Sequence, residues 1–295
     1  MSLQQQYLRD TVKLLRIPFS VFLMPVFLLA VSQVQALDPG HAIWAFVLIH
    51  LLVYPSSNGY NSYIDRDETP IGGLERPPLP PRQLYVTTLV MDLLAVLLGY
   101  VLVKPLFAAC VLVYIAASRA YSSRTIRLKK YTWAGFTTVF VVQGAFTYYC
   151  AYIAASAVPF VFDTAQVLML LGVSLQIGGA YPLTQIYQHD ADLRDGVVTL
   201  SYRLGYLGTF AFTAVLFGAS MLCYYGYFAR TAQMGSFWLL LGFMTPALGF
   251  FGYWLLQVRR DVKAASFQNT MRMNLVSSLS LSLCFTLLIL QNHAL

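Results

Sequence analysis

Carboxylates are concentrated in two short polar stretches of this chain. The first stretch, residues 58–81, reads NGYNSYIDRDETPIGGLERPPLPP and contains Asp65, Asp67, Glu68 and Glu75. The second, residues 187–196, reads YQHDADLRDG and contains Asp190, Asp192 and Asp195. Together they hold seven of the twelve acidic residues of a mostly apolar protein. Such a concentration indicates a polar site.

Oxygen ligands recur at helical spacing in both stretches. If residues 58–65 are helical, Asn58, Asn61 and Asp65 lie on one face. Gln188 and Asp192 are also four residues apart, and Asp195 follows one turn later. Hard cations such as Mg²⁺ take oxygen ligands and leave positions for substrate phosphates. Two facing helices of this kind are suited to a diphosphate whose departure produces a carbocation.

A basic stretch separates the two acidic ones. It contains Arg119, Arg124, Arg127, Lys129 and Lys130. Two interpretations carry equal weight: the cations follow from membrane topology alone, or they neutralise an anion held at the carboxylates.

Other catalytic patterns are absent from the sequence. It has no GxxxxGK[ST], HExxH or GxSxG motif and no pair of histidines at metal-ligand spacing. His189 lies beside the second acidic stretch and is the one histidine worth testing. Asp92 lies inside an apolar run, where a carboxylate is either functional or a hydrogen-bonding partner between helices.

The surrounding elements are expected to be transmembrane helices. Hydrophobic residues make up 58% of the chain, charged residues 11%, and the mean hydropathy is +0.63. Nine apolar runs are long enough to cross a bilayer: residues 17–35, 41–56, 84–103, 105–121, 132–155, 164–187, 207–228, 236–257 and 270–292. We therefore expect an all-α polytopic membrane protein, with residues 1–295 as a single domain and residues 1–16 as an amphipathic helix on the inner surface.

The distribution of basic residues predicts the orientation of these helices. With the N-terminus in the cytoplasm, all of the 19 Lys and Arg residues except Lys104 and Arg230 fall on cytoplasmic segments. The net charge of +7 is then a consequence of topology, and nucleic-acid binding is a poor explanation for it. Both acidic stretches are expected on the cytoplasmic side. If the source is bacterial, the membrane is the inner or plasma membrane.

A polar row and a loop complete the expected site. Tyr181, Thr184, Gln185, Gln188, Asp192 and Asp195 recur at spacings of three and four, and this row should face the interior of the bundle because lipid contact would be costly. After Pro70, two glycines and four prolines exclude a continuous helix. They predict a loop that covers the bound substrate.

At these residues the chain resembles the UbiA-type membrane prenyltransferase superfamily. Members carry an NDxxDxxxD pattern after the second helix and a DxxxD pattern at the end of the sixth. The first pattern corresponds here to residues 61–69, NSYIDRDET, and the second to residues 188–192, QHDAD. The basic segment 121–130, YSSRTIRLKK, also resembles the family's basic loop after the fourth helix.

The resemblance implies nine helices around a central lipid-accessible cavity. It implies Mg²⁺-dependent transfer of an isoprenyl group from its diphosphate to a lipophilic or aromatic acceptor within the membrane. The catalytic residues would be Asp65, Asp192 and Lys129. The metal ligands would be Asn61, Asp65, Asp67, Gln188, Asp192 and Asp195. The residues that bind the diphosphate would be Asn58, Asn61, Arg66, Arg124, Arg127, Lys129, Tyr187 and Gln188.

The chain departs from the family patterns at three positions. Ser62, Thr69 and Gln188 stand where members have aspartate. Asp67 or Glu68 is a candidate substitute for the first-motif aspartate replaced by Thr69, and Asp190 or Asp195 for the one replaced by Gln188. Each lost aspartate removes a negative charge and would weaken metal binding.

Two alternatives to transfer remain open. Intramolecular cyclisation of the same donor needs no acceptor. A transporter, or a lipid-binding membrane protein without catalysis, is compatible with a buried Asp92. Against transport, the carboxylates gather at one membrane face, whereas transporter sites usually lie near the midplane.

Overall fold

The computed structural model describes residues 2–293 and is built from helices. Within these residues, nine helical segments are long and apolar enough to cross a membrane. The expected all-α architecture with nine transmembrane helices is therefore confirmed. The orientation of the termini stays a prediction.

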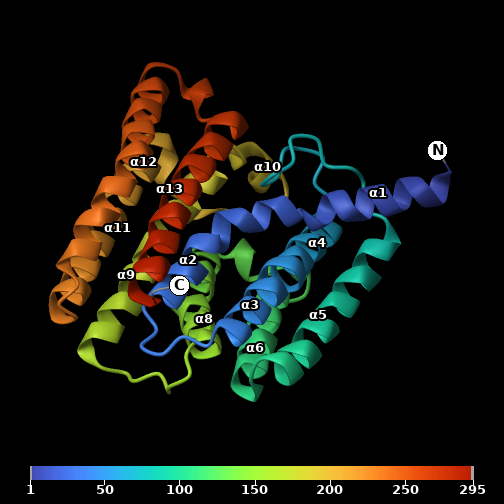
Figure 1. The fold of residues 1–295 in the computed structure, drawn as a ribbon. Helices are drawn as coiled ribbons and strands as arrows, with labels where there is room; N and C mark the ends of the chain where they lie inside the picture. The colour runs from blue at the N-terminus through green and yellow to red at the C-terminus, as the bar shows by residue number, and fades with distance from the viewer. Residues whose placement is uncertain (1, 294–295) are drawn as a thin grey trace.

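The helices follow one another through short connections (Figure 1). The α-helices are α1 Leu3–Leu15, α2 Met24–Ser32, α3 Pro39–Leu48, α4 Tyr54–Asp65, α5 Arg82–Leu102, α6 Pro105–Ser122, α7 Thr132–Val139, α8 Thr147–Ala155, α9 Thr164–Gln185, α10 His189–Arg194, α11 Leu200–Arg230, α12 Met234–Arg260 and α13 Phe267–His293. Three short segments, η1 Ile17–Leu23, η3 Leu128–Lys130 and η5 Val262–Ala264, are 3₁₀ helices. Two more, η2 Ile49–Val53 and η4 Phe140–Phe146, are π-helical.

The first predicted transmembrane run is divided differently from expectation. Residues 17–35 were expected to form one helix, but Ile17–Leu23 is a 3₁₀ helix and α2 covers only Met24–Ser32. Pro18 and Pro25 each lack a backbone donor, and each stands in the first turn of its segment, where that donor is not needed. Arg16, at φ +50°, ends α1 and precedes the 3₁₀ helix Ile17–Leu23.

The second run continues further than its apolar residues indicated. The expected boundary at residue 56 is wrong, because α3, η2 and α4 form one span that reaches Asp65. The π-helical turn precedes Pro55, whose missing N–H interrupts the α-helical hydrogen bonds. Arg66, at φ +54°, ends α4. The polar residues 58–65 are therefore helical, as the one-face arrangement of Asn58 and Asp65 requires.

The seventh run also begins earlier than expected. Helix α11 starts at Leu200 instead of residue 207, and Gly205 breaks it at φ +67° and ψ 178°. Glycine adopts this backbone conformation without the penalty that a Cβ would impose.

The polar loops gather at one end of the bundle. The loop after α4, the short helix α10 and the connection between α12 and α13 lie at the top of Figure 1, and the α5–α6 and α8–α9 connections lie at the bottom. The main core brings α2, α8, α9, α11 and α13 together around fully buried aromatic side chains such as Tyr148, Tyr224 and Phe285. This packing fixes the positions of the helix ends that carry the polar loops.

Candidate active site

A cavity of about 240 Å³ opens among the polar ends of the helices. Its mouth is polar and includes Asp65, Asp67 and Asp192. Its deeper wall is formed by less polar side chains, among them Tyr114 and Val142. A charged group and an apolar chain of one molecule can therefore occupy the two ends of the same space.

Helix α4 forms the first half of the site. Asn58, Asn61 and Asp65 line the cavity from one face of α4, as their spacing predicted. The Asn61 amide donates to Asp65 Oδ2 at 2.8 Å and to Ser122 Oγ on α6 at 3.1 Å. Asp65 Oδ1 is buried and has no hydrogen-bond partner. Arg66 ends the helix and is exposed, outside the cavity.

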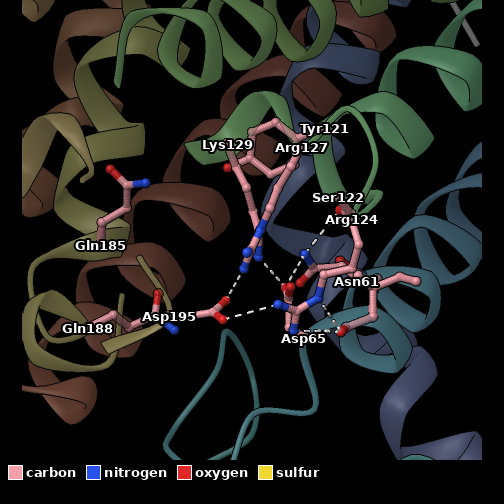
Figure 2. A network of polar contacts seen from close by, with 12 residues as sticks. Asn61, Asp65, Tyr121, Ser122, Arg124, Arg127, Lys129, Gln185, Gln188 and Asp195 are labelled. Carbon is pink, nitrogen blue, oxygen red and sulfur yellow. Dashed lines mark hydrogen bonds and ion pairs between the residues drawn. The ribbon is translucent and has the colours of Figure 1, made fainter. Parts of the chain in front are cut away.

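The basic stretch supplies cations to both halves (Figure 2). Lys129 lines the cavity, and its ammonium forms an ion pair with Asp65 Oδ2. Arg127 and Arg124 both form ion pairs with Asp195, and the Arg124 guanidinium also donates to the Ile64 carbonyl. Three of the five cations in this stretch, Arg124, Arg127 and Lys129, therefore lie at carboxylates of the two polar stretches, which favours the anion-binding interpretation over topology alone.

The end of α9 and helix α10 form the second half. Tyr181, Thr184, Gln185, Gln188 and Asp192 line the cavity, so this part of the predicted polar row does face the interior. Asp195, the last member of the row, lies outside the cavity lining and is half-exposed.

Two carboxyls at the cavity mouth, those of Asp67 and Asp192, have raised pKa values. Burial raises the pKa of Asp192 to about 7 in spite of the opposing charge of Lys129. Burial and the neighbouring charge of Asp65 raise the pKa of Asp67 to about 6. Carboxylates that are desolvated and repel one another are stabilised by a bound cation. The mouth is therefore electrostatically prepared for one.

The loop after α4 covers the cavity mouth. Asp67, Ile71 and Gly72 of this loop line the cavity, and Gln188 donates to the Pro70 carbonyl at 3.1 Å. A Cβ at Gly72 would meet the Phe19 ring at 2.6 Å, so a larger residue here would require the Phe19 side chain to move. The loop joins the two halves of the site.

Arg16 is a site residue that the sequence interpretation missed. It is buried and lines the cavity, and its guanidinium donates to the Gly72 and Asn58 carbonyls at 3.1 Å each. Its Nε has no partner. In the sequence Arg16 was explained by topology, and its partners lie 56 and 42 residues away. No local pattern could have identified it.

Other predicted residues fall into three groups. Tyr187 lines the cavity with Gln188. Glu68 and Asp190 are exposed and outside the cavity lining. His189 is buried away from the cavity, where it bonds to Ser201 Oγ at 2.8 Å and stacks on Tyr206. Ser57 and Ser118, which no motif indicated, and Tyr121, the first residue of the basic segment, complete the wall between α4 and α6.

Asp92 forms a partly buried ion pair outside the site. The Arg119 guanidinium on α6 binds its carboxylate, and Ser56 of α4 donates to Asp92 Oδ1 at 2.6 Å. The guanidinium also lies 3.9 Å from the centre of the Tyr60 ring. This network joins α4, α5 and α6. Asp92 is therefore a hydrogen-bonding partner between helices, which was one of its two predicted roles.

The oxygen donors at the cavity mouth are suited to a metal ion that is shared with a substrate. Within residues 2–293, no group of three or more His, Cys, Asp or Glu side chains is arranged to hold one. Mg²⁺ needs fewer, because it is usually bound by one or two carboxylates together with substrate phosphates and water. The unpartnered Asp65 Oδ1 and the raised pKa values of Asp67 and Asp192 mark suitable oxygen donors. The residues therefore fit Mg²⁺ that binds with a diphosphate.

Comparison with known families identifies the family of this chain. The model of the UbiA prenyltransferase family matches residues 20–276. The chain belongs to this family. No curated protein matches it.

Solved structures of UbiA proteins share the fold. A UbiA homologue from Archaeoglobus fulgidus bound to GPP and Mg²⁺ has a TM-score of 0.68 at 12% sequence identity, over 95% of this chain and 99% of that one. The same homologue bound to Cd²⁺ has a TM-score of 0.67 at 12% identity and the same coverage. A structure described for digeranylgeranylglyceryl phosphate synthase has a TM-score of 0.59 at 13% identity, over 98% of this chain and all of that one.

Family membership gives a meaning to the altered motif positions. In this UbiA protein Asp67 lines the cavity, whereas Glu68 and Thr69 do not. Of the two candidate substitutes for the aspartate replaced by Thr69, Asp67 is therefore the one at the cavity. At the second motif Gln188 lines the cavity and offers a neutral oxygen. The mouth thus keeps carboxylates from both halves with less negative charge than the family patterns carry.

Proposed function

We propose that this protein transfers an isoprenyl group from its diphosphate to a lipophilic or aromatic acceptor within the membrane, with Mg²⁺ as cofactor. One observation carries the proposal: carboxylates from α4 and α10, with Lys129, meet at the mouth of a cavity whose deeper wall is less polar. Family membership and the A. fulgidus homologue, which was solved with GPP and Mg²⁺, support it.

The site residues divide the work of ionisation. Asp65, Asp67 and Asp192, with Asn61, would hold Mg²⁺, which when bound neutralises charge on the diphosphate oxygens. Lys129 is within reach of the same oxygens, and diphosphate binding would draw it from Asp65. As the carbon–oxygen bond breaks, its electron pair leaves with the diphosphate. The Lys129 ammonium would stabilise the charge that develops there.

The covered cavity protects the allylic cation that remains. The loop with Ile71 and Gly72 limits the entry of water from the mouth, and Arg16 fastens this loop to α4. An aromatic face beside the departing diphosphate would stabilise this cation by its quadrupole, and Tyr187 lines the cavity next to Gln188. The acceptor nucleophile then forms the new bond to carbon and releases its proton.

Purified protein with Mg²⁺, isoprenyl diphosphates of increasing length and membrane lipid extract tests the proposal. We expect Mg²⁺-dependent diphosphate release and a prenylated product detected by mass spectrometry. Asp192→Ala should abolish release, whereas Asp261→Ala, on the exposed α12–α13 connection, should not. Release from no donor would overturn the proposal and leave a lipid-binding or transport role. A product with the mass of the donor hydrocarbon alone would indicate cyclisation.

We also propose that the site faces the cytoplasm, because the positive-inside distribution places both polar stretches there. Single cysteines introduced at exposed Glu68 and Asp163 provide the test, because these residues lie on connections at opposite ends of the spans. In intact cells, an impermeant thiol reagent should label Asp163→Cys and spare Glu68→Cys. The opposite labelling would reverse the orientation.

A further inference from the structure

A second, smaller apolar pocket lies directly behind Tyr114. It is lined by Val53 at the end of η2 and Tyr54 at the start of α4, by Cys110 and Val111 on α6, and by Thr147 and Cys150 on α8. Tyr114 lines both this pocket and the site cavity. The Tyr114 side chain is therefore the partition between the two spaces.

The two spaces follow one another along the same helices. On the α4 span, Asp65, Asn61 and Ser57 line the site cavity at intervals of four residues, and Val53 and Ile49 continue the same row into the second pocket. Residues four apart are neighbours on the surface of a helix, so successive members of this row lie next to one another. A chain that enters at the carboxylates and runs along α4 and α6 therefore points at the second pocket.

The distance from the mouth to Tyr114 corresponds to a short chain. Ser122, which bonds Asn61 at the mouth, is eight residues from Tyr114 on α6, or about 12 Å along the helix axis. An extended chain gains about 3.5 Å for three backbone bonds, so an isoprenyl unit with four bonds adds about 5 Å. Two units fit in front of Tyr114, and a third unit meets its ring.

Tyr114 is held in place by the side chains behind it. It is buried, and its ring centre lies 5.8 Å from that of Tyr54. Tyr54 in turn packs edge-on against His50, which stacks on Phe46. Rotation of Tyr114 out of the path of a chain would disturb this aromatic column. The partition is therefore a fixed wall.

We propose that Tyr114 sets the upper length of the isoprenyl donor at two units. The proposal rests on the proposed function and defines its substrate class as short-chain allylic diphosphates, dimethylallyl and geranyl. The pocket behind Tyr114 is closed to the donor as long as the ring is present. Removal of the ring joins the two spaces and admits a third unit.

The ratio of kcat/KM for farnesyl diphosphate to that for geranyl diphosphate is the quantity to measure, by diphosphate release. We expect the wild-type protein to prefer geranyl diphosphate. Tyr114→Ala should raise the ratio at least about tenfold, since a pocket that gains space for even one methylene changes discrimination by 10-fold or more. A ratio cancels any loss of activity that a less stable variant suffers. A competition assay with unreactive thiolodiphosphate donors gives the same ratio from binding if turnover is lost.

Two further variants separate the ring from other effects. Tyr114→Phe keeps the ring and should keep the wild-type ratio. In the double variant Tyr114→Ala/Val111→Phe, the new ring stands on the same face of α6 in the second pocket, and the ratio should return toward the wild-type value. An unchanged ratio in Tyr114→Ala, or equal wild-type use of geranyl and geranylgeranyl diphosphate, would overturn the inference alone. Diphosphate release from no donor would overturn the proposed function, and the inference with it.

Discussion

The two halves of the diphosphate site carry related motifs on differently built supports. Asp65 lies on α4, which continues a membrane-spanning helix, and its side chain is only 4% exposed. Asp192 lies on α10, a helix of six residues that follows the end of α9. The Asp92–Arg119 pair ties α4 to α5 and α6, and within the described residues it has no hydrogen bond to the second half of the site. The comparison indicates that the first half is a rigid platform, whereas the second half is a short segment that cations and the loop hold in place.

The largest effect is expected from the carboxylate at the centre of each half. Asp65→Asn and Asp192→Asn should each lower diphosphate release about a thousandfold, because a metal contributes several kcal/mol of charge stabilisation to the transition state. Asp261→Asn is the matched control, since it changes an exposed aspartate outside the cavity. Near-normal turnover in Asp192→Asn would confine the metal site to the first half.

A second prediction concerns the support of the first half. Asp92→Asn leaves the partly buried Arg119 cation without its charge partner and should destabilise the fold by about 2 kcal/mol, measured as a lower midpoint of thermal unfolding in detergent. The double variant Asp92→Asn/Arg119→Gln removes both charges and should recover much of this loss. If the single variant were as stable as the wild type, α4 would not depend on this pair.

A third prediction concerns the cation of the first half. Lys129→Met removes the ammonium that pairs with Asp65 and should lower kcat about a hundredfold, since a donor aimed at developing charge is worth this much. Lys130→Met is the matched control, because Lys130 is exposed and lies outside the cavity lining. Equal losses in the two variants would show that only the summed positive charge matters.

The smallest effect is expected at Asp195. This carboxylate is 37% exposed, lies outside the cavity lining and pairs with Arg124 and Arg127. Asp195→Asn should lower kcat/KM by less than about tenfold, because ion pairs exposed to solvent contribute about 1 kcal/mol or less. A loss as large as that of Asp192→Asn would place Asp195 among the metal ligands.

The sequence was sufficient for the elements that repeat locally. The apolar runs predicted nine transmembrane helices. The spacing of Asn58, Asn61 and Asp65 predicted that they share one face if this segment is helical, and they do line one cavity. The sequence could not show that α4 reaches Asp65, because apolar content ends before the helix does. Contacts between distant residues were also inaccessible. Lys129 and Asp65 are 64 residues apart, and nothing in either neighbourhood specifies the pairing.

The central claim is that the two halves form one site for a metal and a diphosphate. Isothermal titration of the unreactive geranyl thiolodiphosphate with Mg²⁺ tests it in the wild type, Asp65→Asn, Asp192→Asn and the double variant. Contributions of residues that share a ligand are not additive, whereas those of independent sites are. We predict that binding requires Mg²⁺ and that the double variant loses little more affinity than either single variant. Additive losses, or binding that persists without Mg²⁺, would contradict a single shared site.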